Sequence, residues 1–355
     1  MTRVIPNVPF YVAVVSLVLW TVCSLFVVIP VHLSNTLLSL TLVYIGSYVS
    51  VFTKKDDQMN KDDAAMFPLM ASGALFSLYI AFKYFNEAIV KELIFLYLVI
   101  VAGVAMAGVI NMVVENYLPE VMWSFALTKP FKLSVTVRKC DLVSYPIAFA
   151  FCLAYYFKGF WVGNNILGIF ITIFSLASES IGSFKTGCIL LAGLFLYDIF
   201  WVFGTEVMVK VATGVKGPIK FVFPKALPAP AEMTREAFSM LGLGDVVVPG
   251  FFIAFLLSFD AYNARKEGMD TTASAQWRKP YFHTACVMYA LSLVVTVAVM
   301  LYFKHAQPAL LYIVPAMYLA SFGTALYKKQ VKELWNYSEE EVKTKYSKKN
   351  DWRVC

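Results

Sequence analysis

The sequence predicts an all-α protein that crosses a membrane many times. Apolar residues make up 59% of the 355 residues and charged residues only 15%, whereas a soluble domain carries about 25% charge. The charges are clustered and separate long apolar runs, and about 20 apolar residues can cross a bilayer as a helix. The net charge of +7 is spread over the connections. It indicates attraction to a membrane surface, not binding of nucleic acid.

The N-terminal region predicts two helices before the first charged cluster. No charged residue occurs between Arg3 and Lys54, a stretch longer than one span. Pro30 and the polar residues that follow it divide this stretch, so helices are expected at Val8–Ile29 and Leu37–Phe52. The first helix is either a cleaved signal peptide or a retained extra anchor. In both cases residues 1–33 form a segment of their own.

Eight further apolar runs follow, and with Leu37–Phe52 they predict nine spans. The runs are Ala64–Phe82, Leu93–Val114, Leu142–Phe157, Gly159–Ser178, residues 186–205, residues 237–259, Pro280–Phe303 and Ala306–Tyr327. Residues 34–327 therefore form the membrane domain, and residues 328–355 form a polar tail. The segments predicted on the side of this tail, with the tail included, carry twice as many Lys and Arg as those on the other side, which predicts a cytosolic C-terminus.

Two acidic residues are the main candidates for chemistry. Asp198 is the only charge in the 20 residues between Lys185 and Glu206, and Asp245 is the only charge in the 23 residues between Glu236 and Asp260. An ionised Asp at the centre of a membrane helix costs about 2.5–3.5 kcal/mol, so it usually faces a wet cavity or a partner. Because the two lie on successive spans, they predict one shared site.

A pair of close carboxylates is suited to peptide hydrolysis. Both cannot ionise cheaply, so one carboxyl can activate a water molecule while the other protonates a carbonyl. Gly242 and Gly244 precede Asp245 and permit an unwound backbone, which is tolerated at membrane depth only where it is buried or lines a cavity.

A short strand pattern lies between Pro218 and Pro224. Ile219, Phe221 and Phe223 alternate there with other residues, as in a strand. The segment is either a loop on the membrane surface or an edge strand that pairs with an unwound substrate.

Three motifs together resemble one family. The segments Leu196–Trp201, Gly242–Asp245 and Gln307–Leu310 resemble, in order and spacing, the signal peptide peptidase branch of the presenilin-type intramembrane aspartyl proteases. The resemblance is dense from about Trp161 to Pro315. It implies a nine-helix bundle, to which this chain adds an N-terminal hydrophobic segment. It also implies that Asp198 and Asp245 are catalytic. The residues that it implies shape the site or contact substrate are Tyr197, Gly242, Leu243, Gly244, Pro308, Ala309 and Leu310.

The resemblance implies an intramembrane aspartyl endopeptidase of the endoplasmic reticulum that needs no cofactor. Its partners would be the lipid bilayer and transmembrane peptides, namely signal-peptide remnants and other type II segments, and a homo-oligomer is left open. One alternative is a proton- or cation-coupled transporter or channel, since midplane carboxylates also serve ion coupling. Another is a non-catalytic adaptor that binds signal peptides.

Other catalytic classes find no support in the sequence. The three histidines, His32, His283 and His305, are far apart and in no metal-ligand spacing, so no metal site is predicted. There is also no G-x-S-x-G, H-E-x-x-H or P-loop motif. Serine and metal mechanisms are therefore disfavoured.

Overall fold

The computed structural model describes most of the chain. The described residues are 8–26, 30–53, 58–115, 122–127, 133–204, 215–226, 233, 237–269, 271, 277–303 and 307–339. The first seven residues and residues 340–355 of the predicted tail lie outside these ranges.

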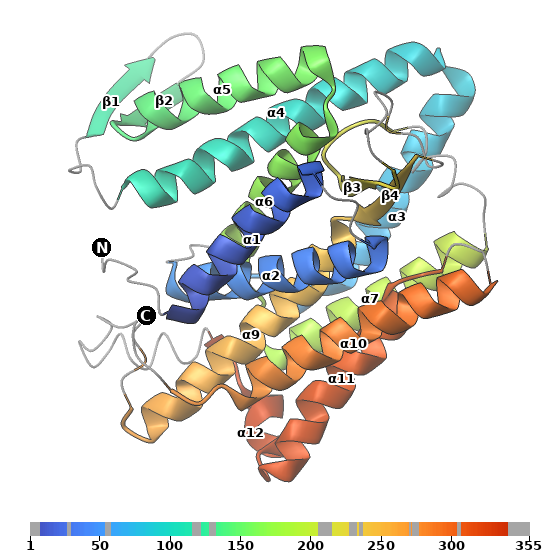
Figure 1. The fold of residues 1–355 in the computed structure, drawn as a ribbon. Helices are drawn as coiled ribbons and strands as arrows, with labels where there is room; N and C mark the ends of the chain where they lie inside the picture. Colours follow the sequence, from blue (N-terminus) through green and yellow to red (C-terminus); the bar gives the residue numbers. More distant parts are fainter. Residues whose placement is uncertain are drawn as a thin grey trace.

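The chain folds as a bundle of long helices with two small hairpins (Figure 1). The long helices are α1 (Val8–Phe26), α2 (Val31–Phe52), α3 (Lys61–Tyr84), α4 (Glu87–Val114), α5 (Asp141–Lys158), α6 (Trp161–Ser178), α7 (Phe184–Phe203), α9 (Gly244–Lys266), α10 (Pro280–Phe303) and α11 (Leu310–Tyr327). The remaining described elements are β1 (Met122–Leu127), β2 (Leu133–Arg138), β3 (Lys220–Pro224), β4 (Phe238–Gly242) and the short helix α12 (Val331–Asn336).

The described helices confirm an all-α membrane protein. Seven of them, α3, α4, α6, α7, α9, α10 and α11, are long and apolar enough to cross a membrane. Helices α2 and α5 have 22 and 18 residues and are packed among them. The described part of the chain from Val31 to Tyr327 thus has a long helix for each of the nine predicted spans.

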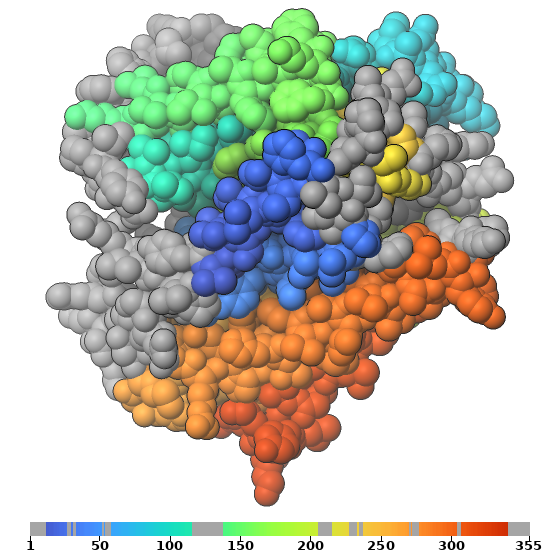
Figure 2. Space-filling model, in the orientation of Figure 1, coloured from blue at the N-terminus to red at the C-terminus, as the bar shows by residue number. Residues whose placement is uncertain are grey.

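Helix α2 lies near the centre of the bundle. It packs against α6, α9 and α10, while α4 and α5 pack together on one side and α10 and α11 on the other (Figure 1). Helix α1 packs on α2 and lies at the surface of the bundle, where Figure 2 shows it in dark blue. The most buried of the candidate spans is α9, the helix that carries Asp245.

Small residues allow the helices around the site to approach closely. The side chain of Leu176 on α6 lies between Gly46 of α2 and Gly250 of α9. A Cβ atom at Gly46 would clash with Leu176 Cδ1, and one at Gly250 would lie 2.9 Å from Leu176 Cδ2. Because neither glycine has a side chain, α6 fits tightly against both α2 and α9.

Helix α2 begins earlier than predicted. It starts at Val31, directly after Pro30, so the predicted start at Leu37 is wrong and the boundary after residue 33 falls inside the helix. The polar residues that suggested a break lie inside the bundle, since Ser34 and Asn35 are buried. The hydroxyl of Ser39 donates to the carbonyl of Asn35 at 2.7 Å. Polarity alone therefore did not mark a helix end.

Two other elements were not predicted. The connection between α4 and α5 contains an antiparallel hairpin, in which β1 pairs with β2. The beginning of the predicted polar tail folds back as α12, where Leu334 is only 1% exposed. Tyr337 is also buried, and its carbonyl accepts a hydrogen bond from the Phe184 N–H. The predicted tail thus contains a short helix, which packs against α7.

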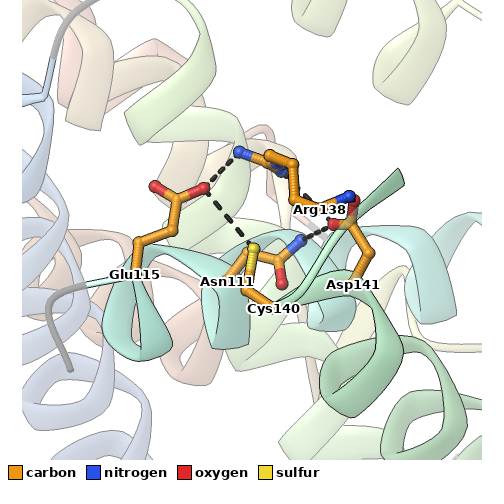
Figure 3. Close-up of polar contacts among 5 residues, drawn as sticks. All are labelled: Asn111, Glu115, Arg138, Cys140 and Asp141. Atoms are coloured by element: carbon orange, nitrogen blue, oxygen red, sulfur yellow. Dashed lines mark hydrogen bonds and ion pairs between the residues drawn. The ribbon is translucent and has the colours of Figure 1, made fainter. Parts of the chain in front are cut away.

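A polar cluster joins the end of α4 to the start of α5 (Figure 3). The Arg138 guanidinium forms ion pairs with Glu115 and with Asp141. The Asn111 side chain donates to Asp141 Oδ1 at 2.7 Å, and the Arg138 N–H donates to Asp141 Oδ2 at 2.8 Å. The Cys140 thiol lies 3.8 Å from the Glu115 carboxylate. The cluster ties the last turn of α4 to the first residue of α5.

We expect this cluster to make stability depend on acid pH. Burial by itself raises the pKa of Asp141, but hydrogen bonds from Arg138 and Asn111 and the charge of Arg138 lower it overall. A carboxyl group whose pKa is lower in the folded state than its ordinary value of about 3.9 stabilises the fold above about pH 4. This contribution is lost as the pH falls through the folded pKa. The melting temperature of the wild type in detergent should therefore fall more steeply below about pH 5 than that of Asp141→Asn. Parallel curves for the two proteins would contradict this assignment.

Candidate active site

Asp198 lies on α7 and is bound by the start of another helix. Its side chain is 6% exposed, and its Oδ2 accepts a hydrogen bond of 2.9 Å from the N–H of Leu310. Leu310 is the first residue of α11, and Ala309 before it gives the helix no side-chain cap. The Asp198 carboxylate therefore takes the place of a cap, and the positive end of the α11 dipole faces it.

The third sequence motif thus meets the first one in space. Pro308, Ala309 and Leu310 form the turn that begins α11, with the Tyr312 N–H bonded to the Ala309 carbonyl. Through Leu310, this turn is in direct contact with Asp198. Tyr197 is half-buried beside Asp198 on α7, and its ring lies 6.4 Å from that of Trp201.

Asp245 lies in the first turn of α9 and is close enough to Asp198 for the two carboxyl groups to interact electrostatically. Its backbone carbonyl accepts a hydrogen bond of 2.9 Å from the Tyr289 hydroxyl of α10. The two sequence-predicted acids therefore come together from α7 and α9, and α10 helps to hold the start of α9 in place.

The Gly-Leu-Gly segment before Asp245 has a different environment at each residue. A Cβ atom at Gly242 would lie 3.4 Å from Asp245 Oδ2. Gly244 is exposed, and a Cβ atom there would meet no other atom of the described chain within 4 Å. Leu243 is buried, and its N–H donates to the Ile219 carbonyl at 3.0 Å. No described residue therefore fills the space beside Gly244, the residue that precedes Asp245.

The predicted strand is present and belongs to a hairpin that ends at the site. Strand β3 pairs with β4 in antiparallel register, with Phe221 opposite Leu241 and Lys220 opposite Gly242. Ile219 comes directly before β3, while Phe221 and Phe223 are buried. Strand β4 leads directly into Leu243 and then α9, so the sheet is continuous with the segment that carries Asp245.

The two outer edges of this hairpin differ. On β3, the Val222 N–H and carbonyl are bonded to the Asn165 side chain, and the Lys220 carbonyl is bonded to Asn164. On β4, the N–H and carbonyl groups of Met240 and Gly242 point outward and have no partner among the residues that the structure describes. The sequence left open that the Pro218–Pro224 segment pairs with a substrate, but the outer edge of β3 is already bonded to Asn164 and Asn165.

A third buried acid was missed by the sequence analysis. Asp260 on α9 is 2% exposed, and its carboxylate accepts hydrogen bonds from the N–H groups of Tyr281 and Phe282 in the first turn of α10. It lies 15 residues after Asp245 along α9, or about 22 Å at ~1.5 Å per residue. Asp260 therefore caps α10 and takes no part in the pair. In the described part of the chain, no group of three His, Cys, Asp or Glu residues is arranged to hold a metal ion.

The sequence is similar to intramembrane proteases. A profile of the signal peptide peptidase family matches residues 52–341. The signal peptide peptidase of Homo sapiens is 37% identical over 293 residues, which cover 79% of this chain and 74% of the human protein. A probable intramembrane protease of Schizosaccharomyces pombe is 33% identical over 305 residues, covering 85% of this chain and 92% of that protein.

A third relative is similar over a shorter region. Intramembrane protease 2 of Caenorhabditis elegans is 40% identical over 211 residues, covering 59% of this chain and 45% of that protein. All the site residues described above, from Asn164 to Leu310, lie within the region that the family profile matches, whereas α1 precedes it.

Proposed function

The chain belongs to the signal peptide peptidase family and is an intramembrane protease, and on that premise we propose that its catalytic groups are Asp198 and Asp245. The two carboxyl groups share one proton and activate one water molecule. The observation that carries this proposal is the meeting of α7, α9 and the start of α11 around the two acids.

The neighbouring residues support this assignment because each favours a reaction at the pair. The Leu310 N–H orients the Asp198 carboxylate, and the open space beside Gly244 gives water and a peptide access to Asp245. Gly242 lies against the Asp245 carboxylate without a side chain that would cover it. Pro308 and Ala309 shape the turn that presents the Leu310 N–H.

The chemistry follows from one proton shared by two carboxyl groups. The ionised carboxylate takes a proton from water, and the resulting hydroxide forms a bond to the peptide carbonyl carbon. The protonated carboxyl donates its proton to the carbonyl oxygen, which gives a tetrahedral gem-diol. Proton transfer to the amide nitrogen then breaks the C–N bond, and the gem-diol returns a proton to the pair. No covalent enzyme intermediate forms, and the pair titrates as a unit.

A substrate must be locally extended before this reaction, because a helix hides its amide bonds in its own hydrogen-bond ladder. We assign the pairing strand to β4, since no described residue is bonded to its outer edge and it runs into the Asp245 segment. An extended peptide that adds to β4 would pair with Met240 and Gly242. Phe221 and Phe223 on β3, and Ile219 directly before it, would support the hairpin and would not touch the substrate backbone.

Backbone esters in the substrate test this assignment. An ester in place of one amide removes a single N–H donor, and the strand pattern predicts that every second position matters. An ester at a residue that pairs with β4 should lower kcat/KM by about 2- to 12-fold, since a hydrogen bond contributes about 0.5–1.5 kcal/mol. Cleavage rates are measured for peptides with esters at successive positions on each side of the scissile bond, which stays an amide.

The neighbouring ester positions serve as controls, because their N–H groups point away from β4. A uniform effect at all positions, or none at any, would argue against pairing with β4. Either outcome would leave unaffected the proposal that Asp198 and Asp245 are the catalytic groups.

The proposed substrates are signal-peptide remnants and other type II membrane segments, and the proposed location is the endoplasmic reticulum membrane, with the C-terminus in the cytosol. The named relatives are proteases, and no observation favours a transporter. The test is to incubate the purified protein with a labelled signal peptide and to identify the fragments by mass spectrometry. An intact peptide after prolonged incubation would refute the proposed substrate class.

A further inference from the structure

Asn164 and Asn165 are two polar residues inside an apolar helix. They are the fourth and fifth residues of α6 and are 1% and 4% exposed. A buried carboxamide is costly unless its donor and acceptor are both satisfied. Both side chains are satisfied mainly by β3, which lies more than fifty residues away in sequence.

Asn165 imitates a residue of a third strand. Its Oδ1 accepts from the Val222 N–H at 2.9 Å, and its Nδ2 donates to the Val222 carbonyl at 2.8 Å. A carboxamide has the same donor and acceptor as a peptide group, so Asn165 bonds to Val222 as a neighbouring strand would. Asn164 Nδ2 donates to the Lys220 carbonyl at 2.6 Å, and its Oδ1 accepts from the Tyr155 hydroxyl at 3.1 Å.

These bonds close the outer edge of β3. The outward-facing residues of this strand are Lys220, Val222 and Pro224, because the residues between them pair with β4. Asn164 is bonded to the Lys220 carbonyl, and Asn165 is bonded to the N–H and carbonyl of Val222. Pro224 has no N–H to donate. An additional strand can therefore pair only with β4, on the side of the sheet that leads to Asp245.

The same contacts fix the register of β3 on α6. If β3 moved by two residues, Asn165 would face either Lys220 or Pro224, and Pro224 cannot donate. The Phe221 ring also sits against Gly168 of α6, where a Cβ atom would lie 3.0 Å from Phe221 Cε1. Since β4 pairs with β3 residue by residue and leads through Leu243 into α9, α6 helps to fix where the β4 edge and Asp245 lie relative to Asp198 on α7.

We propose that Asn165 and Asn164 are positioning residues for proteolysis, which fix the register of the β3–β4 sheet and thereby select the peptide bond that reaches Asp198 and Asp245. This inference rests on the proposed role of β4 as the strand that pairs with substrate. It predicts which peptide bond of the substrate is cleaved, so it is tested by the position of cleavage and not only by the rate.

The test compares two variants of Asn165 with a control on the same helix. Asn165→Leu removes both hydrogen bonds to Val222, whereas Asn165→Asp keeps an acceptor for the Val222 N–H and loses the donor. The control is Thr172→Val, because the buried Thr172 hydroxyl donates to the Gly168 carbonyl within α6 at 2.9 Å. Each purified protein is incubated with one labelled signal peptide, and the fragment masses give the cleaved bonds. Thermal melting and titration with a hydroxyethylene-isostere peptide give the folded, active fraction.

The inference predicts new products cut two residues from the wild-type bond. Their ratio to the wild-type product should rise by about 5- to 150-fold in Asn165→Leu, which loses two hydrogen bonds, and by about 2- to 12-fold in Asn165→Asp. Thr172→Val should keep the wild-type products. If Asn165→Leu does not fold, Asn165→Asp decides the question.

The possible failures are distinguishable. Cleavage at the wild-type bond alone in the folded Asn165 variants, at whatever rate, would overturn this inference and leave the proposed function standing. A wild-type protein that does not cleave, or cleavage that persists in Asp198→Asn, would overturn the proposed function and this inference with it.

Discussion

Asp198→Asn and Asp245→Asn are each expected to abolish cleavage of a labelled signal peptide, with a loss in kcat on the order of 10⁴-fold. Each substitution removes one of the two groups that hold the shared proton, so water can be activated or the carbonyl protonated, but not both. Because the pair acts as a unit, the double variant should be no worse than either single variant. The fragments are measured by mass spectrometry at equal amounts of folded protein.

Asparagine is preferable to alanine at Asp198 because this residue also has a structural role. Its Oδ2 accepts the N–H of Leu310 at the start of α11, and an asparagine oxygen can keep that bond. Asp198→Ala would leave a helix N–H without its acceptor, at a cost of about 1–3 kcal/mol. An unchanged melting temperature in Asp198→Asn would show that the loss of activity is chemical.

Asp260→Asn is the matched control for a buried acid on the same helix as Asp245. It weakens the bonds to the N–H groups of Tyr281 and Phe282, so it should lower the melting temperature. Cleavage per folded molecule should persist, because Asp260 caps α10 and lies outside the pair. Fragments released by purified Asp198→Asn or Asp245→Asn at the wild-type rate would refute the catalytic pair.

The membrane spans and the two candidate catalytic acids could be predicted because their signals are local. A charge inside a long apolar run is visible in the sequence, and it is costly in a membrane wherever the fold places it. The strand at Lys220–Pro224 was also visible, because two prolines bound a short alternating segment. In each case the neighbouring residues alone carry the information.

The partners of buried polar groups could not be predicted, because they are backbone groups distant in sequence. Asn165 bonds to Val222, and Asp260 bonds to the first turn of α10. Nothing in an isolated Asn or Asp shows which N–H or carbonyl it will meet. The early start of α2 has the same cause, since Asn35 is polar in sequence but buried among other helices.

Gly242→Val is expected to lower kcat/KM by about 100-fold or more while the protein stays folded. Gly242 is the last residue of β4, and its φ is not among the positive values found in the described glycines. Valine therefore fits the backbone, and β-branched residues suit strands. Its Cβ would lie 3.4 Å from Asp245 Oδ2, and its methyl groups would cover the carboxylate and the adjacent strand edge.

The combination of unchanged stability and lost cleavage separates this prediction from general damage. Gly323→Val on α11 is the control, because a Cβ atom there would meet no atom of the described chain within 4 Å. It should retain both stability and cleavage. Binding of a hydroxyethylene-isostere peptide should weaken in Gly242→Val but not in Gly323→Val, since only the former crowds the pair. Full cleavage by Gly242→Val would mean that neither water nor substrate approaches Asp245 from the β4 side. The proposal that substrate pairs with the outer edge of β4 would then be refuted.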